Sequence, residues 1–318
     1  MRTSVILLAY YGDDWIPACV ASLASASKEK LHLVLLDNAG NTVLDKLDYS
    51  AFDLELLKAP EPLGFAAANN YALVNSRGLE ETVLFLNQDT KGEAGWIDAC
   101  SACFSDPSLG AISPLVRTYD DTGWDQGFEA NLATEIGRDP AGERAWFETQ
   151  VVLAASLIVR TTALIQSGPF DPFYGSYYED YDLSLRLRRG GWKVGFCRRA
   201  KLFHFSGSVT SSPEKARKRT RQILRNRLLY NLRSSDVDRR LAMLRHYAID
   251  LGPRLARGFL KTPSSQPPAV ILEAEWDVLK SGDRFASRSR DERAWASYLE
   301  SIGWRTRAPR LRQKRTDA

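Results

Sequence analysis

The sequence predicts an α/β fold with a doubly wound, mostly parallel sheet. Short apolar runs of strand length alternate with segments whose apolar residues recur at helical spacing. Polar residues follow the apolar runs, as is typical of parallel strands whose carboxyl ends share one edge of a sheet. The runs that we expect to be strands are residues 4–10, 31–36, 52–57 and 83–86, with helices at 16–23 and 66–75.

The pattern becomes less regular after residue 111. Residues 118–144 are polar and contain several glycines, which favours a long loop or lid. Beyond this segment the apolar pattern predicts a strand at 150–159, a short helix at 162–167, and strands at 193–197 and 201–205.

The chain changes character after Pro213 and becomes basic. Apolar residues recur at helical spacing in segments 214–233, 244–255, 271–279 and 292–302, and residues 263–268 have the composition of a linker. We therefore predict three parts, which are an α/β domain at 1–212, a helical region at 213–304, and a basic, flexible tail at 305–318.

Charge is divided unevenly along the 318 residues. Residues 1–184 contain 11 Lys and Arg against 27 Asp and Glu, whereas residues 185–318 contain 32 against 12, so the two parts carry net charges of −16 and +20. A basic part of this kind favours anionic partners such as phosphates, phospholipid surfaces or nucleic acid. The alternative is a basic face that balances an acidic one within the same molecule.

The four cysteines are too few for a disulfide framework in a chain of this length. Cys100 and Cys103 form a C-x-x-C, but the second pair that a zinc site needs is absent, so we expect both in a buried helix after Trp96. The first residues turn acidic too soon for a signal peptide, and the apolar run at 151–159 is too short to span a membrane. These features predict a cytoplasmic protein and leave contact with the inner face of the cell membrane open.

Polar residues after the predicted strands should line one crevice at the carboxyl edge of the sheet. Asn87 and Asp89 point the same way on an extended backbone, and their oxygens suit a Mg²⁺ or Mn²⁺ ion that bridges two phosphates. A turn that caps the next helix explains these two residues equally well. The residues expected in the crevice are Tyr10, Tyr11, Asp37, Asn38, Asn87, Gln88, Asp89 and Thr90.

The segment from residue 59 to residue 73 contains a glycine followed by small residues and paired asparagines. Gly64 lets the backbone turn tightly, the alanines after it let a helix begin close to a ligand, and Asn69 and Asn70 add amide donors. The segment is neither a G-x-G-x-x-G motif nor a P-loop, so it supports neither a dinucleotide-binding protein nor an NTPase.

The stretch GSYYEDYDLSLRLRRGGW, residues 175–192, places three carboxylates at the start of a predicted helix that ends in arginines. An acidic N-terminus and a basic C-terminus are favourable for a helix in themselves. However, Glu179, Asp180 and Asp182 exceed what capping needs. Among three tyrosines, one carboxylate could have a pKa raised enough to accept a proton from a hydroxyl group.

His204 lies between Phe203 and Phe205 on a predicted strand, so its side chain points opposite to both rings. A single histidine is more often a structural residue. A neutral imidazole beside a carboxylate is, however, a good ligand for Mn²⁺.

Taken in order, these motifs resemble the inverting family 2 glycosyltransferases of GT-A fold, in particular a bacterial rhamnosyltransferase-like branch. The resemblance spans about residues 4–233 and depends on the order and spacing of SVILLAYYGD, LLDNAGN, LGFAAANN, FLNQDT, the stretch 175–192, HFSGS and QILRNRLLYN. It implies a Rossmann-like, mostly parallel sheet flanked by helices, with a helical C-terminal extension.

The resemblance also implies roles for individual residues. Asp180 matches the general base, with Glu179 beside it in the catalytic pair. Asp89 matches the last acid of the metal and diphosphate motif, and His204 matches a position that can complete the metal site. The chain departs from the family at Gln88, and at residues 154–156, where the family often has a glycine beside the acceptor. The residues at donor-binding positions are Ala9, Tyr10, Asp37, Asn38, Gly64, Phe65, Asn70, Asn87, Gln88 and Asp89.

From this resemblance we expect a metal-dependent enzyme with Mn²⁺ or Mg²⁺ as cofactor. It would move a hexose or rhamnose, with inversion, from a nucleotide-diphosphate sugar to a hydroxyl of a glycan or lipid-linked acceptor in cell-surface polysaccharide synthesis. The basic helices would contact an anionic membrane, pack on the catalytic domain or form a homodimer. The alternatives are a sugar-nucleotide-binding protein that has lost catalysis and a basic nucleic-acid-binding protein, although no RNA or DNA module is recognisable.

Overall fold

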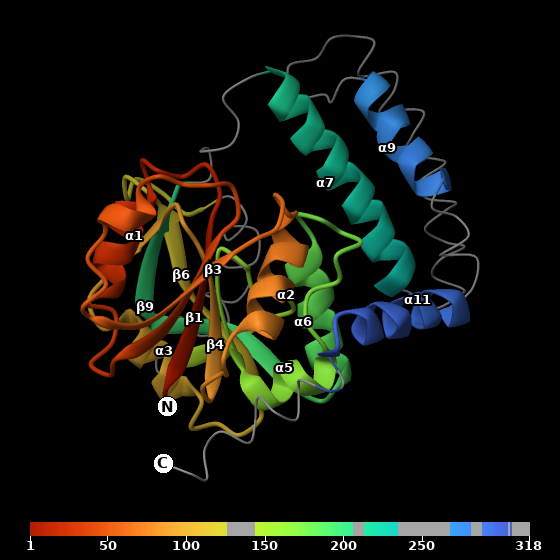
Figure 1. Cartoon of the computed structure of the whole chain (residues 1–318). Coiled ribbons are helices and arrows are strands. Elements are labelled where there is room, and N and C mark those ends of the chain that lie inside the picture. The colour runs from red at the N-terminus through yellow and green to blue at the C-terminus, as the bar shows by residue number, and fades with distance from the viewer. Residues whose placement is uncertain (126–143, 206–212, 235–267, 281–287, 305, 307–318) are drawn as a thin grey trace. The chain divides into compact units, whose positions relative to one another are not determined.

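The structure, a computed structural model, describes residues 1–125, 144–205, 213–234, 268–280, 288–304 and 306 (Figure 1). The predictions made for residues 126–143, 244–255, 263–267 and 307–318 lie outside the described residues. The described strands form one nine-stranded sheet in the order β3-β2-β1-β4-β8-β6-β9-β5, with β7 paired to β9.

Four parallel strands form one half of the sheet. They are β1 (Thr3–Ala9), β2 (Leu31–Asp37), β3 (Phe52–Lys58) and β4 (Thr82–Asn87). β1 pairs with β2 and β4 so that Ala9 lies beside Asp37 and Leu8 lies beside Asn87. The carboxyl ends of these strands therefore share one edge, and the predicted α/β class is confirmed.

The other half of the sheet is mixed. It contains β5 (Thr90–Gly92), β6 (Leu109–Thr118), β7 (Trp146–Glu148), β8 (Ser156–Arg160) and β9 (Lys193–His204). β8 runs antiparallel to both β4 and β6, whereas β9 runs parallel to β6 and antiparallel to β5 and β7. The sequence did not predict β5, β6 or β7, because two of them are only three residues long and β6 lies where the apolar pattern had become irregular.

Two strand predictions were wrong. The predicted strand at 150–159 begins only at Ser156, because the N–H groups of Val152 and Ala154 bond to side chains of a neighbouring helix instead of to a strand. The strands predicted at 193–197 and 201–205 form the single strand β9, with residues 198–200 bulging out at a register shift. The shift falls at Pro114 of β6, which has no N–H to donate to its neighbour.

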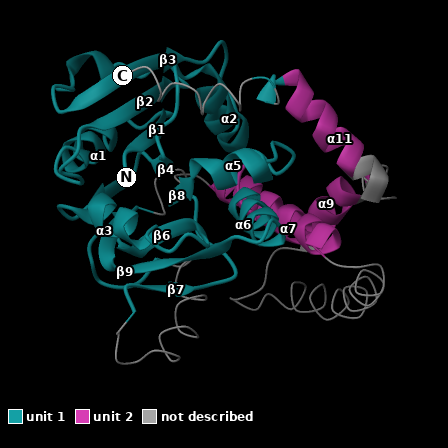
Figure 2. Ribbon diagram, turned by 90° about the horizontal axis from the view of Figure 1, so that it is seen from below, with its two compact units in different colours: residues 1–175, 179–208, 302–318 teal, residues 176–178, 209–301 magenta. Residues whose placement is uncertain are grey.

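Helices cover both faces of the sheet (Figures 1 and 2). α1 (Ile16–Leu23) and α3 (Trp96–Cys103) pack on the face that includes Val5 and Leu7 of β1. α2 (Phe65–Asn75), α5 (Thr161–Ser167) and α6 (Glu179–Arg189) lie on the other face, and a short 3-10 helix, η1 (Leu44–Lys46), follows β2. Cys100 and Cys103 are buried free thiols in α3, as predicted.

The chain divides into two compact units, which Figure 2 shows in different colours. One unit contains residues 1–175, 179–208 and 302–318, and the other contains residues 176–178 and 209–301. The second unit includes α7 (Pro213–Ser234), α9 (Pro268–Lys280) and α11 (Arg288–Ser301), so the helices predicted at 214–233, 271–279 and 292–302 are confirmed.

Basic α7 pairs with acidic residues of α9. The guanidinium of Arg221 binds Asp277 through two hydrogen bonds of 2.7 Å, and Arg217 pairs with Glu273. Part of the positive charge of this region is therefore balanced within the same unit.

None of the helices in the described ranges has the length and apolar character that a membrane crossing requires.

Arg186 ties α6 to the end of α5. Its guanidinium donates to the carbonyl oxygens of Ser167, Gly168 and Pro169 at 2.7 to 3.0 Å. It also pairs with Asp182, one helical turn away, at 2.8 Å. Because Asp182 is buried, removing the arginine would take away the countercharge of a buried carboxylate.

We expect Arg186→Ala to lower the free energy of unfolding by about 3 kcal/mol, as is typical when one partner of a buried ion pair is lost. Lys30→Ala, at an exposed position of the same unit, should change it by less than about 0.5 kcal/mol. Urea unfolding followed by circular dichroism measures both values. Equal effects of the two substitutions would contradict the structural role of Arg186.

Candidate active site

Two aromatic rings lie at the carboxyl end of β1. Tyr10 is 41% exposed and Tyr11 is 72% exposed, with ring centroids 4.7 Å apart. Tyr11 has a φ of 49°, a left-handed conformation that is unusual for a bulky residue. Exposed rings at the edge of a sheet offer a flat surface on which a nucleotide base can stack.

The side chain of Gln88 holds the backbone of Tyr10. Its Oε1 accepts the Tyr10 N–H at 2.7 Å, and its Nε2 donates to the Tyr10 carbonyl oxygen at 2.7 Å. The amide lies directly over Gly12, where an added Cβ would come within 2.2 Å of the Gln88 side chain. Gln88 is therefore engaged with the loop after β1, and its influence on a donor would act through the position of Tyr10.

Asn38 and Asn70 use their amides in the same way. Asn38 donates to the carbonyl oxygen of Leu63 and accepts its N–H, both at 2.9 Å. Asn70 donates to the carbonyl oxygen of Phe170 at 2.7 Å and accepts its N–H at 3.0 Å. Both asparagines are buried, and these side chains fix the loops at Leu63 and Phe170.

Asp37, at the end of β2, organises the turn that follows it. One oxygen, Oδ1, accepts the N–H groups of Ala39, Gly40 and Asn41 and the side-chain amide of Asn41, at 2.8 to 3.3 Å. Partial burial opposes ionisation, but these hydrogen bonds outweigh it and lower the pKa of Asp37 below its usual value. Asp37 is therefore a charged group at the carboxyl end of β2, beside the end of β1.

The loop before α2 lies beside the segment that leads to α6. The N–H of Ala66 donates to the carbonyl oxygen of Gly175 at 2.9 Å, and Gly64 lies against the Cα of the same glycine. Phe65 packs near Phe170, with ring centroids 6.0 Å apart. Gly64 and Phe65, predicted from the sequence as donor-binding residues, thus lie close to the chain that carries the acidic cluster.

His204 lies between two carboxylates, with its side chain 14% exposed. Its Nε2 lies 3.4 Å from Oδ1 of Asp89 and 3.5 Å from the amide nitrogen of Asn87, and its Nδ1 lies 3.1 Å from Oδ2 of Asp125. Burial disfavours the charged imidazole, but hydrogen bonds to Asp125 and Asp89 outweigh it and raise the pKa of His204 to about 9.

The donor set at Asp89 and His204 fits a divalent cation held jointly with a ligand. Two ligands at about 2.1 Å from an octahedral ion lie about 3 Å apart, close to the 3.4 Å between the two side chains. No group of three His, Cys, Asp or Glu in the described part of the chain is arranged to hold a metal by itself. Sites of this kind commonly take their remaining ligands from substrate phosphates and water.

The three carboxylates at the start of α6 have different environments. Asp182 pairs with Arg186 and is structural. Glu179 is 5% exposed, and its Oε2 has no hydrogen-bond partner among the described residues. Burial and the neighbouring Asp180 raise the pKa of Glu179 well above its usual range, which favours the protonated form.

Asp180 is the carboxylate arranged to carry charge. Its Oδ2 accepts the N–H of Ala154 at 3.1 Å and its Oδ1 accepts the N–H of Tyr181 at 2.9 Å. Burial raises the pKa of Asp180, while these hydrogen bonds oppose the rise. A partly exposed carboxylate with a raised pKa is suited to accept a proton from a bound hydroxyl.

Residues 154–155 connect this carboxylate to the end of β4. The N–H of Ala154 binds Asp180, and the carbonyl oxygen of Ala155 accepts the N–H of Asn87 at 3.0 Å. Asp180 and the run from Asn87 to Asp89 therefore approach two consecutive residues of one segment, at the carboxyl edge of the parallel strands.

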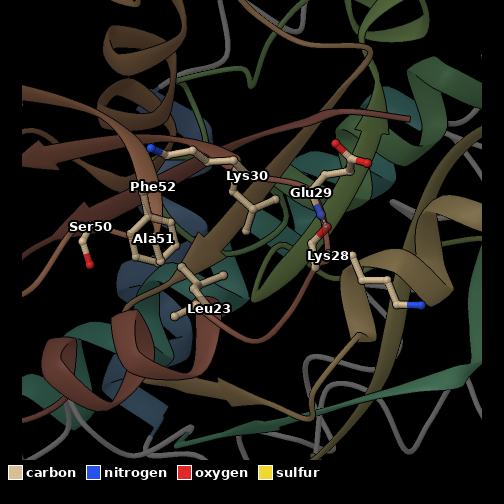
Figure 3. Close-up of a pocket in the computed structure, with 10 residues that line it drawn as sticks. Leu23, Lys28, Glu29, Lys30, Ser50, Ala51 and Phe52 are labelled. Carbon is tan, nitrogen blue, oxygen red and sulfur yellow. Dashed lines mark hydrogen bonds between the residues drawn. The ribbon is translucent and has the colours of Figure 1, made fainter.

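A pocket of about 300 Å³ lies at the opposite end of the parallel strands, where β2 and β3 begin (Figure 3). Its walls come from the end of α1 and from the beginnings of β2 and β3, including Leu23, Lys28, Lys30 and Phe52. Because the strands begin there, this pocket is separate from the candidate active site.

Sequence reasoning did not find several residues near the site. Asp125 lies in a segment predicted only as a loop, and nothing in its local pattern indicated a contact with His204. Trp15 stacks on Phe205 at 4.1 Å, with Tyr119 edge-on at 5.2 Å from Trp15. Trp15 follows Asp13 and Asp14 in the loop after β1, so its place at the carboxyl edge was predictable, but its partners were not.

No protein-family model matches the chain. The N-acetylglucosaminyl-diphospho-decaprenol L-rhamnosyltransferase of Mycobacterium tuberculosis (strain ATCC 25618 / H37Rv) is 26% identical over 235 residues, which cover 65% of this chain and 76% of that protein. The pre-mycofactocin glycosyltransferase of the same organism is 25% identical over 170 residues, covering 52% of this chain and 36% of that protein.

Solved structures show the same fold. S. aureus TarS in complex with UDP-GlcNAc aligns with 97% of this chain and 90% of its own, with a TM-score of 0.55 and 16% identity. The mannosyltransferase PcManGT from Pyrobaculum calidifontis, in complex with GDP-Man and Mn²⁺, aligns with 98% and 84% of the two chains, with a TM-score of 0.51 and 15% identity. Against a longer TarS chain the alignment spans 39% of that chain. The GT-A fold and the resemblance to rhamnosyltransferase-like glycosyltransferases are confirmed.

We expect Gly12→Ala to displace the Gln88 amide and to lower the free energy of unfolding by about 1–3 kcal/mol, because both hydrogen bonds to Tyr10 would be lost. In a Gln88→Ala background the same substitution should cost less than about 1 kcal/mol, since the clash is gone. Thermal and urea unfolding of the two single variants and the double variant measure this coupling. Additive effects would contradict the contact between Gln88 and Gly12.

We expect Glu179→Gln to become more stable relative to the wild type as pH rises. The pKa of Glu179 is raised in the folded state, so its contribution is complete below the unfolded value near 4.5 and is lost as pH rises through the folded pKa. Glutamine does not ionise and avoids this loss. Unfolding midpoints between about pH 5 and pH 9 test the trend, with the exposed Glu148→Gln as control. A difference that does not change with pH would refute the buried, protonated state.

Proposed function

We propose that this chain of GT-A fold is an inverting glycosyltransferase that takes a sugar from a nucleotide-diphosphate donor. The observation that supports it best is the approach of Asp180 and the Asn87–Asp89 run to residues 154–155. This geometry brings a carboxylate suited to act as a base near the residues suited to hold a diphosphate. Transfer with inversion needs such a pairing, because the acceptor attacks from the face opposite the leaving group.

The donor would lie along the edge formed by the ends of β1, β2 and β4. Tyr10 offers its exposed ring to the base, and Asp37 presents a carboxylate on the rim of the crevice. Gly64 and Phe65 begin α2, directly after Leu63, which Asn38 ties to the end of β2. Asn38, Asn70 and Gln88 support the donor site by holding its loops in place.

Asp89 and His204 would hold a divalent cation, Mn²⁺ or Mg²⁺, with Asn87 beside them. When bound, the cation would neutralise the charge that develops on the leaving diphosphate. PcManGT was solved with GDP-Man and Mn²⁺, which supports Mn²⁺ as the first ion to test here.

Asp180 would accept the proton of the acceptor hydroxyl. The N–H groups of Ala154 and Tyr181 hold its two oxygens in one orientation, so little reorganisation is needed when the hydroxyl approaches. The buried, protonated Glu179 beside it adds no second negative charge.

The acceptor would be a hydroxyl of a lipid-linked glycan, with rhamnose as the leading candidate for the transferred sugar. The M. tuberculosis relative is named for an N-acetylglucosaminyl-diphospho-decaprenol acceptor and for L-rhamnose. The basic face of α7 would contact the anionic surface of a membrane that carries such an acceptor.

We expect Asp180→Asn to bind the donor within about twofold of the wild type, while turnover falls about a hundredfold or more. Asparagine keeps the shape of the side chain but cannot take up the proton. Donor binding is measured by the thermal shift with UDP-, GDP- and dTDP-sugars, and turnover by transfer to a lipid-diphosphate-linked glycan. Glu148→Gln, an exposed carboxylate of the same unit, is the control. Normal turnover in Asp180→Asn would rule out Asp180 as the base.

A further inference from the structure

We propose that Asp125 is a positioning residue that orients the imidazole of His204 toward the cation. The inference depends on the proposed function, because it concerns the residues that would hold the metal. It adds a residue that neither the sequence motifs nor the resemblance pointed to.

The two nitrogens of His204 have different neighbours. Nδ1 lies 3.1 Å from Oδ2 of Asp125, within hydrogen-bond distance, and Nε2 faces Oδ1 of Asp89 at 3.4 Å. The side chains of all three residues are 8 to 14% exposed. A ring held this deeply at one nitrogen has little freedom to rotate, so the contact with Asp125 decides where the other nitrogen points.

The chemistry of imidazole explains why this contact matters. In the neutral ring one nitrogen donates a hydrogen bond and the other offers a lone pair. When Nδ1 donates to Asp125, a cation that takes the place of the Nε2 proton meets the Nε2 lone pair on the side of Asp89. Histidines that bind metals commonly donate their second N–H to a carboxylate in this way, and loss of that partner weakens metal affinity by about 10- to 100-fold.

The backbone around Asp125 holds the carboxylate in place. Its N–H donates to the carbonyl oxygen of Val116 at 3.2 Å, and the preceding turn is closed by the N–H of Thr118 and the carbonyl oxygen of Gly123 at 3.0 Å. The guanidinium of Arg117 covers the ring of Trp124 at 4.7 Å. These contacts hold Asp125 beside the end of β6.

β6 and β9 are neighbours at this point. Thr118, at the end of β6, pairs with His204, at the end of β9. The carboxylate and the imidazole are therefore brought together by adjacent strands and a closed turn, which is a rigid arrangement suited to orienting a ligand.

The test measures Mn²⁺ affinity of the full chain by the electron paramagnetic resonance signal of free Mn²⁺, with Mn²⁺ alone and with UDP or GDP. We expect Asp125→Ala to weaken Mn²⁺ binding by about 10- to 100-fold. Asp125→Asn should weaken it by about two- to tenfold, because the neutral amide oxygen still accepts the Nδ1 hydrogen but more weakly than the carboxylate. Asp120→Asn removes a charge from the same turn at an exposed position and should leave the affinity unchanged.

Wild-type Mn²⁺ affinity in folded Asp125→Ala would overturn the inference. If Asp125→Ala does not fold, the Mn²⁺ affinity of Asp125→Asn is the deciding measurement. An affinity equal to that of Asp120→Asn would then overturn the inference. A wild-type protein that binds no Mn²⁺, with or without nucleotide, would overturn it as well. Sugar transfer by the wild type and its loss in Asp180→Asn are measured separately, so failure of this inference is distinguishable from failure of the proposed function.

Discussion

The parallel pairing of β1 with β2 and β4 is the constraint on which the rest of the site depends. It places Ala9 beside Asp37 and Leu8 beside Asn87. The carboxyl ends of β1, β2 and β4 therefore lie next to one another. The register is fixed because these strands are buried on both faces, and a slip would move each side chain to the opposite face. The same apolar packing that stabilises the sheet therefore aligns the polar residues that follow it.

Three amide side chains hold the loops at this edge in place. Gln88, Asn38 and Asn70 each pair with both the N–H and the carbonyl oxygen of one residue in another loop. Loops at the edge of a sheet have backbone groups that the sheet itself does not satisfy, and each amide satisfies two of them. Loops held in this way need less ordering when a ligand binds.

The three carboxylates at the start of α6 can lie close together because each has a different environment. Glu179 is buried and favours its protonated form, Asp182 is neutralised by Arg186, and Asp180 has N–H donors for both oxygens. Three ionised carboxylates this close together would repel one another strongly. The arrangement leaves one of them as the group suited to exchange a proton.

The sequence by itself determined the α/β class, the four parallel strands and most of the helices, because apolar periodicity reports directly which side chains are buried. It also indicated Asp89, Asp180 and His204 as candidate site residues, through short motifs that can be read along the chain. Tertiary structure alone decided that residues 150–155 bond to α6, that β9 is one bulged strand, and that Asp125 binds His204. These features join residues that are far apart in sequence or depend on which N–H finds which acceptor, and neither composition nor periodicity carries that information. The backbone partners of Asn38, Asn70 and Gln88 were not predictable for the same reason, because an amide can bind a ligand or a backbone group and only the folded chain selects its partner.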